Sequence, residues 1–357
     1  MASKNAVLKS YLAPLASLAA LAIAGVILEQ TANAYVQLII LYLFANIILA
    51  LSLNLVNGFT GQFSIGHAGF MAVGAYVSAW LSMKPEVFGT TLTFLPESLD
   101  YLNYLIYAIC GGLVAAAAGY VVGLPSLRLR GDYLAIVTLG FGEIIRVVLL
   151  NTQAVGGARG MFGIPSAKEV ALGPVSLSPF YVNYLLSAFW ATVTFVVLWR
   201  LVHSVHGRAF LSVREDEIAA QAMGVDTTKV KVRAFVLSSF FAGIAGAIFA
   251  HSAHYLNPST FSFTKSVDAI IMVVLGGMGS LTGSVFAAVI VTLLPEFVLR
   301  PLQDYTGVDL RMVIYSLALI LFMIIRPAGL FGTRELSDLF RSRKQDTLGG
   351  GSHGRAS

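Results

Sequence analysis

The sequence has few charged residues and a single cysteine. Charged side chains make up 11% of its 357 residues, whereas soluble domains carry about 25%. Hydrophobic residues make up 57%, which predicts an integral membrane protein rather than a soluble enzyme with a membrane anchor. Because Cys110 has no second cysteine to pair with, no disulfide can form within the chain.

The motifs of nucleotide, metal and catalytic sites are also missing. No glycine is directly followed by lysine, so the chain cannot bind ATP through a Walker A loop. There is no His-Glu-x-x-His motif and no cysteine and histidine cluster with metal-ligand spacing. We therefore predict no catalytic residue, no metal site and no cofactor. A net charge of +5 could suggest a nucleic-acid partner, but in a membrane protein the distribution of charge matters more than its sum, so we predict none. Any ATP-driven work must use a partner subunit.

Apolar segments that could cross a membrane recur along the chain, and they predict an all-α polytopic membrane protein with about ten transmembrane helices. The expected spans are Tyr11 to Leu28, Tyr35 to Val56, Ala68 to Ser82, Tyr104 to Leu124, Tyr133 to Leu150, Tyr181 to Leu201, Ala234 to Ala250, Val267 to Leu275, Ser284 to Leu299 and Met312 to Ile325. The first could instead be a signal peptide, because Ala32-Asn33-Ala34 has the form of a cleavage site, but its length favours a retained span. Residues 1–340 are expected to form one transmembrane domain, and 341–357 a disordered tail.

The positions of lysine and arginine predict the orientation. Of the 23 lysine and arginine residues, sixteen fall on the side of the N-terminus and six on the other side, and Arg146 lies within a span. Cytoplasmic loops of membrane proteins carry such an excess, so both termini and the loop 203–233 are expected in the cytoplasm.

The polar stretch Ser212 to Arg233 within this loop predicts two short helices separated by a turn. The first helix would run from Glu215 to Met223, with acidic residues in its first turn and Gly224 ending it. Asp226 or Thr227 would cap the second helix. The small side chains of this helix would let another protein approach its backbone closely. They belong to Ala219, Ala220 and Ala222. An ordinary solvated loop remains the alternative.

Two glycine-rich stretches interrupt the apolar pattern, Asn57 to Gly69 and Gly276 to Ser284. Each has the form of a broken or re-entrant helix, and irregular backbone at membrane depth must be buried in protein or line a cavity. The candidates for lining a pathway are Asn57, Gly61, Gln62, Ser64, His67, Gly277 and Gly279. For His67 a plain packing role is the alternative.

One expected span contains an acid and a base. Glu143 and Arg146 are three residues apart and so lie on one helical face, with Glu143 about 16 Å into the span at 1.5 Å per residue. Such a pair must face protein or water. It either serves as a gate or fixes helix register, and no second carboxylate at membrane depth is evident to support ion coupling.

Small residues recur at helical spacing in three spans and predict seams of close helix packing. They are Ala68, Ala72, Ala75 and Ala79; Gly111, Ala115, Gly119 and Gly123; and Ala242, Gly246 and Ala250.

Four blocks of this sequence together resemble the LivM-type permease subunit of bacterial branched-chain amino-acid ABC importers. The blocks begin at Asn54 (NLVNGFTGQFSIGHAGFMAVGAY), Arg130 (RGDYLAIVTLGFGEIIR), Gly207 (GRAFLSVREDEIAAQAMGVDTTKVKVRAF) and Val274 (VLGGMGSLTGSVFAA). The resemblance extends from about Tyr35 to Gly332.

The resemblance implies function and partners that composition cannot supply. It implies a permease without ATPase activity, located in the bacterial inner membrane, that pairs with a LivH-type permease subunit. Two ABC ATPase subunits would dock on the cytoplasmic loops, and a periplasmic or lipid-anchored binding protein would deliver the substrate. The implied ATPase-docking residues are Glu215, Asp216, Glu217, Ala219, Ala220 and Gly224. Permeases for urea and short amides resemble the same blocks, and an ion-coupled secondary transporter is a third possibility.

Overall fold

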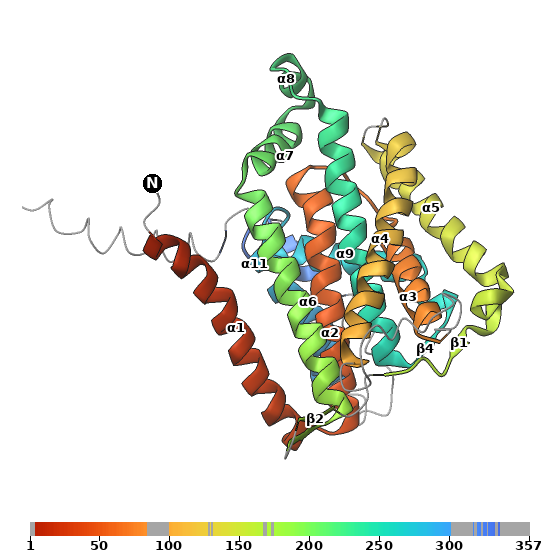
Figure 1. Cartoon of the computed structure of the whole chain (residues 1–357). Helices are drawn as coiled ribbons and strands as arrows, with labels where there is room; N and C mark the ends of the chain where they lie inside the picture. Colours follow the sequence, from red (N-terminus) through yellow and green to blue (C-terminus); the bar gives the residue numbers. More distant parts are fainter. Residues whose placement is uncertain are drawn as a thin grey trace, which may run out of the picture.

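The computed structural model is a bundle of long apolar helices with a smaller pair of polar helices at one end (Figure 1). It describes residues 4–83, 100–127, 129, 131–166, 170–172, 175–300, 317, 320–322, 324–326, 328–332 and 335. Within these residues, five helices are long and apolar enough to cross a membrane. They are Ala34–Phe59, Asn103–Ser126, Tyr133–Asn151, Pro179–Val202 and Thr227–Ala253.

The elements follow the expected spans closely as far as the middle of the chain. The first half contains α1 (Lys4–Thr31), α2 (Ala34–Asn54), a π-helical turn (Leu55–Phe59), α3 (His67–Met83), α4 (Asp100–Ser126), α5 (Asp132–Asn151), two 3-10 turns (Gln153–Val155 and Gly157–Arg159), β1 (Met161–Phe162), β2 (Val170–Leu172) and β3 (Val175–Leu177). The second half contains α6 (Pro179–Val202), α7 (Val205–Glu215), α8 (Glu217–Ala222), α9 (Thr227–Ala253), β4 (Tyr255–Leu256), a 3-10 turn (Pro258–Phe261), α10 (Phe263–Gly276), α11 (Leu281–Leu294) and a second π-helical turn (Pro295–Leu299).

Helix α9 lies among α2, α3 and α4, and α1 lies at the edge of the bundle against α6 (Figure 1). The predicted small-residue seams are confirmed. A Cβ on Gly246 of α9 would lie 1.9 Å from the carbonyl oxygen of Met71 in α3, and one on Gly119 of α4 would lie 2.3 Å from Oγ of Ser239. These helix backbones therefore approach one another more closely than larger side chains would permit.

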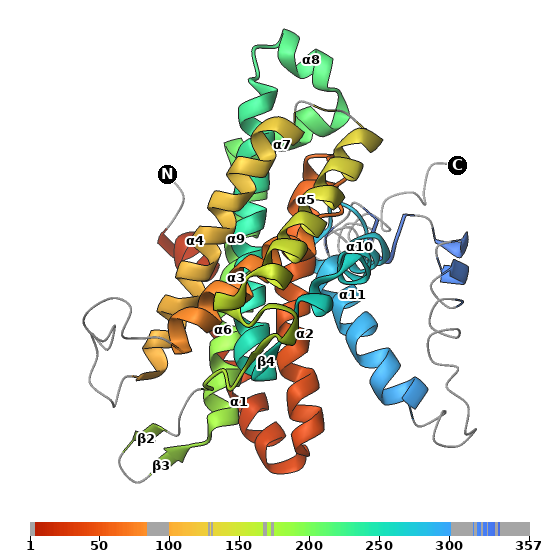
Figure 2. The same cartoon turned by 90° about the vertical axis from the view of Figure 1, so that its right-hand side faces the viewer.

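The described residues support the expected all-α polytopic class, with β1 paired to β4 and β2 paired to β3 in two small antiparallel sheets far from α8 (Figure 2). The expected number of about ten spans is not confirmed, because five described helices are long and apolar enough to cross a membrane. One expectation needs correction: the second helix of the polar loop is not a separate element, because α9 runs without interruption from Thr227 into the bundle. Its first turns are polar, so a hydropathy pattern places its start too late.

The C-terminal region is only partly described. Helices α10 and α11 have 14 residues each and occupy the places of the eighth and ninth expected spans. Much of the tenth expected span, Met312 to Ile325, and the tail 341–357 lie outside the described residues. Residues 328–332 return to the bundle, where the backbone N–H groups of Leu330 and Phe331 donate to the carbonyl oxygens of Leu275 and Gly276.

Candidate functional site

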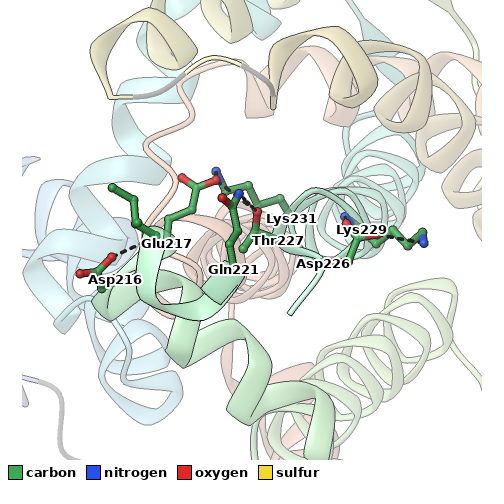
Figure 3. Close-up of polar contacts among 8 residues, drawn as sticks. Asp216, Glu217, Gln221, Asp226, Thr227, Lys229 and Lys231 are labelled. Carbon is green, nitrogen blue, oxygen red and sulfur yellow. Dashed lines mark hydrogen bonds and ion pairs between the residues drawn. The ribbon is translucent and has the colours of Figure 1, made fainter. Parts of the chain in front are cut away.

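The first candidate site is the turn between α7 and α9, which carries the short helix α8 (Figure 3). Asp216 ends α7 and caps α8, because its Oδ1 accepts hydrogen bonds from the backbone N–H groups of Ile218 (2.8 Å) and Ala219 (3.0 Å). Gly224 follows with a φ of +84°, a left-handed conformation that ends the helix. The predicted stop at Gly224 is therefore confirmed, whereas Asp216, which was expected in the first turn, caps the helix, and α8 begins at Glu217 rather than Glu215.

A polar network fixes α8 against the start of α9. The Nζ atom of Lys231 donates to Oε1 of Glu217 at 2.7 Å, and both side chains are largely buried. Thr227 donates to the same carboxylate oxygen and accepts from Nε2 of Gln221 at 2.8 Å (Figure 3). Four side chains thus tie α8 to the first turns of α9.

The cap of α9 lies on the exposed side of this turn. Asp226 accepts from the backbone N–H of Lys229, whose ammonium group also lies 2.9 Å from the carboxylate. Hydrogen bonds from the side chain and then the backbone of Lys229 lower the pKa of Asp226 from its ordinary value. The cap is therefore strongest above the ordinary pKa of aspartate and is lost as pH falls through the lowered value.

The surface that α8 presents differs from the one expected. Ala220 is 5% exposed and packs inward, and Glu217 is paired with Lys231, so neither offers a free contact surface. The outer face carries Ile218 (67% exposed) and Met223 (84% exposed), which sequence reasoning missed. The other expected docking residues, Glu215, Asp216, Ala219 and Gly224, are exposed. The exposed face is thus apolar with an acidic edge.

The second candidate site is formed by the two glycine-rich stretches, which the structure brings together. Asn54, at the end of α2, joins them. Its Oδ1 accepts from the backbone N–H of Gly279 at 2.9 Å, and its Nδ2 donates to the carbonyl oxygen of Ser280 and to Oγ of Ser284. Only glycine fits at position 58, because a Cβ on Gly58 would lie 2.4 Å from the backbone nitrogen of Gly279. We call Gly58–Gly61 and Gly277–Gly279 the paired breaks.

The expected pathway residues lie close to the paired breaks. Asn57 holds the loop closed by exchanging hydrogen bonds with the backbone of Ser64. Gln62 and the hydroxyl of Ser64 are buried, and their side-chain polar atoms have no hydrogen-bond partner among the described residues. His67 is buried and its Nε2 lies 2.8 Å from Oγ of Ser52, which fits the packing alternative. Gly61 is exposed, whereas Gly277 approaches Gly332.

Two further polar groups near these elements were missed from the sequence. Glu335 caps α11, because its carboxylate accepts from the backbone N–H groups of Leu281 (2.7 Å) and Thr282 (3.1 Å). Asp268 lies partly buried in α10, near the start of the eighth expected span. Nearby Lys265 donates to Asn46 of α2.

The third candidate is the ion pair on α5. Nε of Arg146 lies 2.7 Å from Oε2 of Glu143, so the predicted pairing is confirmed. The pair is not enclosed by the chain, however, because its side chains remain 25% and 35% exposed. The same helix exposes large apolar side chains, which are Tyr133, Ile136, Ile144, Val147 and Val148.

An apolar cavity of about 730 Å³ lies between α3 and α4 and is bounded by the end of α5. Cys110 lines it, and none of the expected pathway residues does. No group of three metal-ligating side chains occurs in the described ranges.

Apolar helices long enough to cross a membrane, the paired breaks between helices and a capped polar turn at one end are features of a multi-pass membrane transport protein. The chain belongs to the family of permease components of branched-chain amino acid transport systems, which matches residues 35–325. It is 38% identical over 305 residues to the high-affinity branched-chain amino acid transport permease LivM of Salmonella typhimurium, covering 80% of this chain and 67% of the relative. It is 26% identical over 326 residues to the probable LivM of Methanocaldococcus jannaschii (83% and 92%), and 22% identical over 300 residues to the permease LivH of Salmonella typhimurium (81% and 92%). No solved structure matches the chain.

Proposed function

We propose that this permease is one of two permease subunits of an ATP-driven importer for branched-chain amino acids in the bacterial inner membrane. Relatives named for branched-chain amino acid transport cover most of its length, which supports this substrate class. A soluble or lipid-anchored binding protein delivers the amino acid, and the permease provides the route across the membrane.

Helix α8 is the docking element for an ABC ATPase, and the observation that carries this assignment is its fixed, outward-facing geometry. Asp216 caps α8 and Glu217 ties it to Lys231, while Ile218 and Met223 stay exposed on the outer face. Exposed apolar side chains held on a rigid element favour burial in a partner's groove. ATP hydrolysis takes place on that partner, and each permease subunit receives one of two ATPase subunits.

The partly exposed ion pair of α5 supports pairing with a second permease subunit. A charged pair near the middle of a span is costly against lipid and must face protein or water. Glu143 and Arg146 satisfy each other, and their side chains stay 35% and 25% exposed in the described chain. A LivH-type subunit packed against α5 would cover the pair and the apolar side chains around it.

The paired breaks form the end of the pathway nearest α8. Irregular backbone at membrane depth is tolerated where it lines a cavity, and beside the breaks Gln62 and Ser64 hold side-chain polar atoms that have no partner in the described part of the chain. An opening of this region would give those atoms water or substrate to bind. Both termini and α8 then lie on the cytoplasmic side.

Thiol labelling in intact cells tests this orientation and the pathway together, in a Cys110→Ser background. Met223→Cys is expected to react with a membrane-impermeant reagent only after permeabilisation, because α8 faces the cytoplasm. Ser64→Cys is expected to react with a small reagent at a rate that depends on nucleotide. Labelling of Met223→Cys in intact cells would contradict the orientation, and equal inertness of Ser64→Cys in every nucleotide state would contradict the pathway.

Uptake by the reconstituted complex tests the function. Proteoliposomes with the second permease subunit, the ATPase subunits and binding protein are expected to accumulate radiolabelled leucine only with ATP. Accumulation of urea instead would favour the amide-transport alternative. Uptake driven by a proton or sodium gradient without ATP would contradict the proposal, and Asp268 would then become the first carboxylate to examine.

A further inference from the structure

Arg214 lies in the last turn of α7, directly before the cap of α8, and its side chain reaches the paired breaks. Its Nη1 donates to the carbonyl oxygen of Gly58 at 3.1 Å. A Cβ on Gly61 would lie 2.9 Å from Cγ of Arg214, and one on Gly279 would lie 2.8 Å from Nη1. One side chain from the α7–α8 turn therefore packs against both breaks.

The guanidinium group of Arg214 is held in a defined orientation. Oε1 of Glu215 accepts hydrogen bonds from Nε (3.2 Å) and Nη2 (2.8 Å), which leaves Nη1 directed at Gly58. Gly58 belongs to the π-helical turn that ends α2, where backbone carbonyl groups carry partial negative charge. A fixed cation at this position is a favourable and directional contact.

A continuous series of contacts joins α8 to the second break through Arg214. Asp216 connects the last turn of α7 to α8, Arg214 connects α7 to Gly58, and Asn54, which lies four residues before Gly58 at the end of α2, connects this segment to Gly279. The two breaks meet at glycines, so no flexible side chain lies between their backbones. A small shift of Gly58 therefore displaces the second break as well. Displacement of α8 would thus reach both breaks together.

We propose that Arg214 is the positioning residue that couples movement of α8 to opening of the paired breaks. This inference rests on the proposed function, since α8 must receive an ATPase for the coupling to operate. Arg214 touches neither nucleotide nor substrate in this arrangement. It sets how much transport follows from each ATP hydrolysed.

The test compares Arg214→Ala and Arg214→Lys with native protein in reconstituted complexes. The matched control is Arg208→Ala, which removes an arginine from an exposed position on the same helix. Leucine uptake, ATP hydrolysis, copurification of the ATPase and melting temperature are measured for each complex. For Arg214→Ala, we expect normal copurification and a fall of about tenfold or more in uptake per ATP, the range of a typical coupling energy.

Arg214→Lys should give an intermediate ratio, because an ammonium group can reach Gly58 but cannot be held at two points by Glu215. Arg208→Ala should match native protein. A native ratio in Arg214→Ala would overturn the inference, as would a loss of copurification or melting temperature that accounts for all lost uptake. If Arg214→Ala does not assemble, a native ratio in Arg214→Lys overturns it. Failure of the native complex to bind an ATPase would instead contradict the proposed function, and this inference with it.

Discussion

Replacing Ile218 and Met223 with aspartate is expected to abolish ATP-driven uptake and copurification of the ATPase. Both side chains are exposed on α8, so the membrane bundle should tolerate the change. If a groove of the ATPase buries these two side chains in the native complex, it would have to bury two unpaired carboxylates in the variant, which is energetically costly. Loss of a central interface contact costs about 2 kcal/mol, or roughly thirtyfold in affinity, so two such losses should separate the subunits.

The matched control for this variant is Val205→Asp. Val205 is 69% exposed, like Ile218 at 67%, but it begins α7 rather than belonging to α8. Uptake by the permease complex and copurification of the ATPase should both remain near native in the control. Normal copurification and uptake in Ile218→Asp with Met223→Asp would show that α8 is not the docking element.

The turn around α8 shows what local sequence signals can predict. Gly224 as a stop and Asp226 as a cap of the next helix follow from backbone hydrogen bonding within a few residues, and both were recognised from the sequence, whereas Asp216 was expected within the first turn of α8 rather than as its cap. The direction of each side chain was not, because it depends on how the helix packs. Ala220 therefore faces inward, and a large substitution there would test the folding of the turn rather than docking.

The paired breaks show where sequence reasoning stops. Glycine spacing predicted two interruptions, but nothing in either stretch indicates that Asn54 joins it to Gly279, 225 positions away. The same holds for Arg214 and Gly58, and for Glu335 at the start of α11. Each is a contact between distant segments, and its partner is specified by the fold as a whole.

The architecture could be predicted at two levels of detail. Long apolar segments set the positions of α2, α4, α5 and α6, because burial in a membrane imposes a length and a composition. The short helices α10 and α11 were located mainly by the glycines between them. The small sheets carry no pattern longer than three residues, which is too short for periodicity to reveal.

Replacing only one member of the ion pair on α5 is expected to be more damaging than replacing both. In Glu143→Gln or Arg146→Gln the remaining charge loses the partner now found at 2.7 Å, and it has no other ion-pair partner among the described residues. If a second permease subunit covers this face, that charge becomes buried and unpaired, at a cost of about 3 to 5 kcal/mol. The double replacement Glu143→Leu with Arg146→Leu leaves no charge and should be far milder.

The measurements for these variants are the yield of the single chain and its copurification with the second permease subunit. Because the pair is partly exposed in the chain alone, single replacements should reduce copurification more strongly than the yield of the isolated subunit. The double replacement is the matched control, since it removes the same two groups without leaving a charge. Equal loss of copurification in the single and double variants would contradict a covered ion pair. If the double variant assembles normally and uptake is nevertheless lost, the pair acts in transport itself, as the gate that its position within the span first suggested.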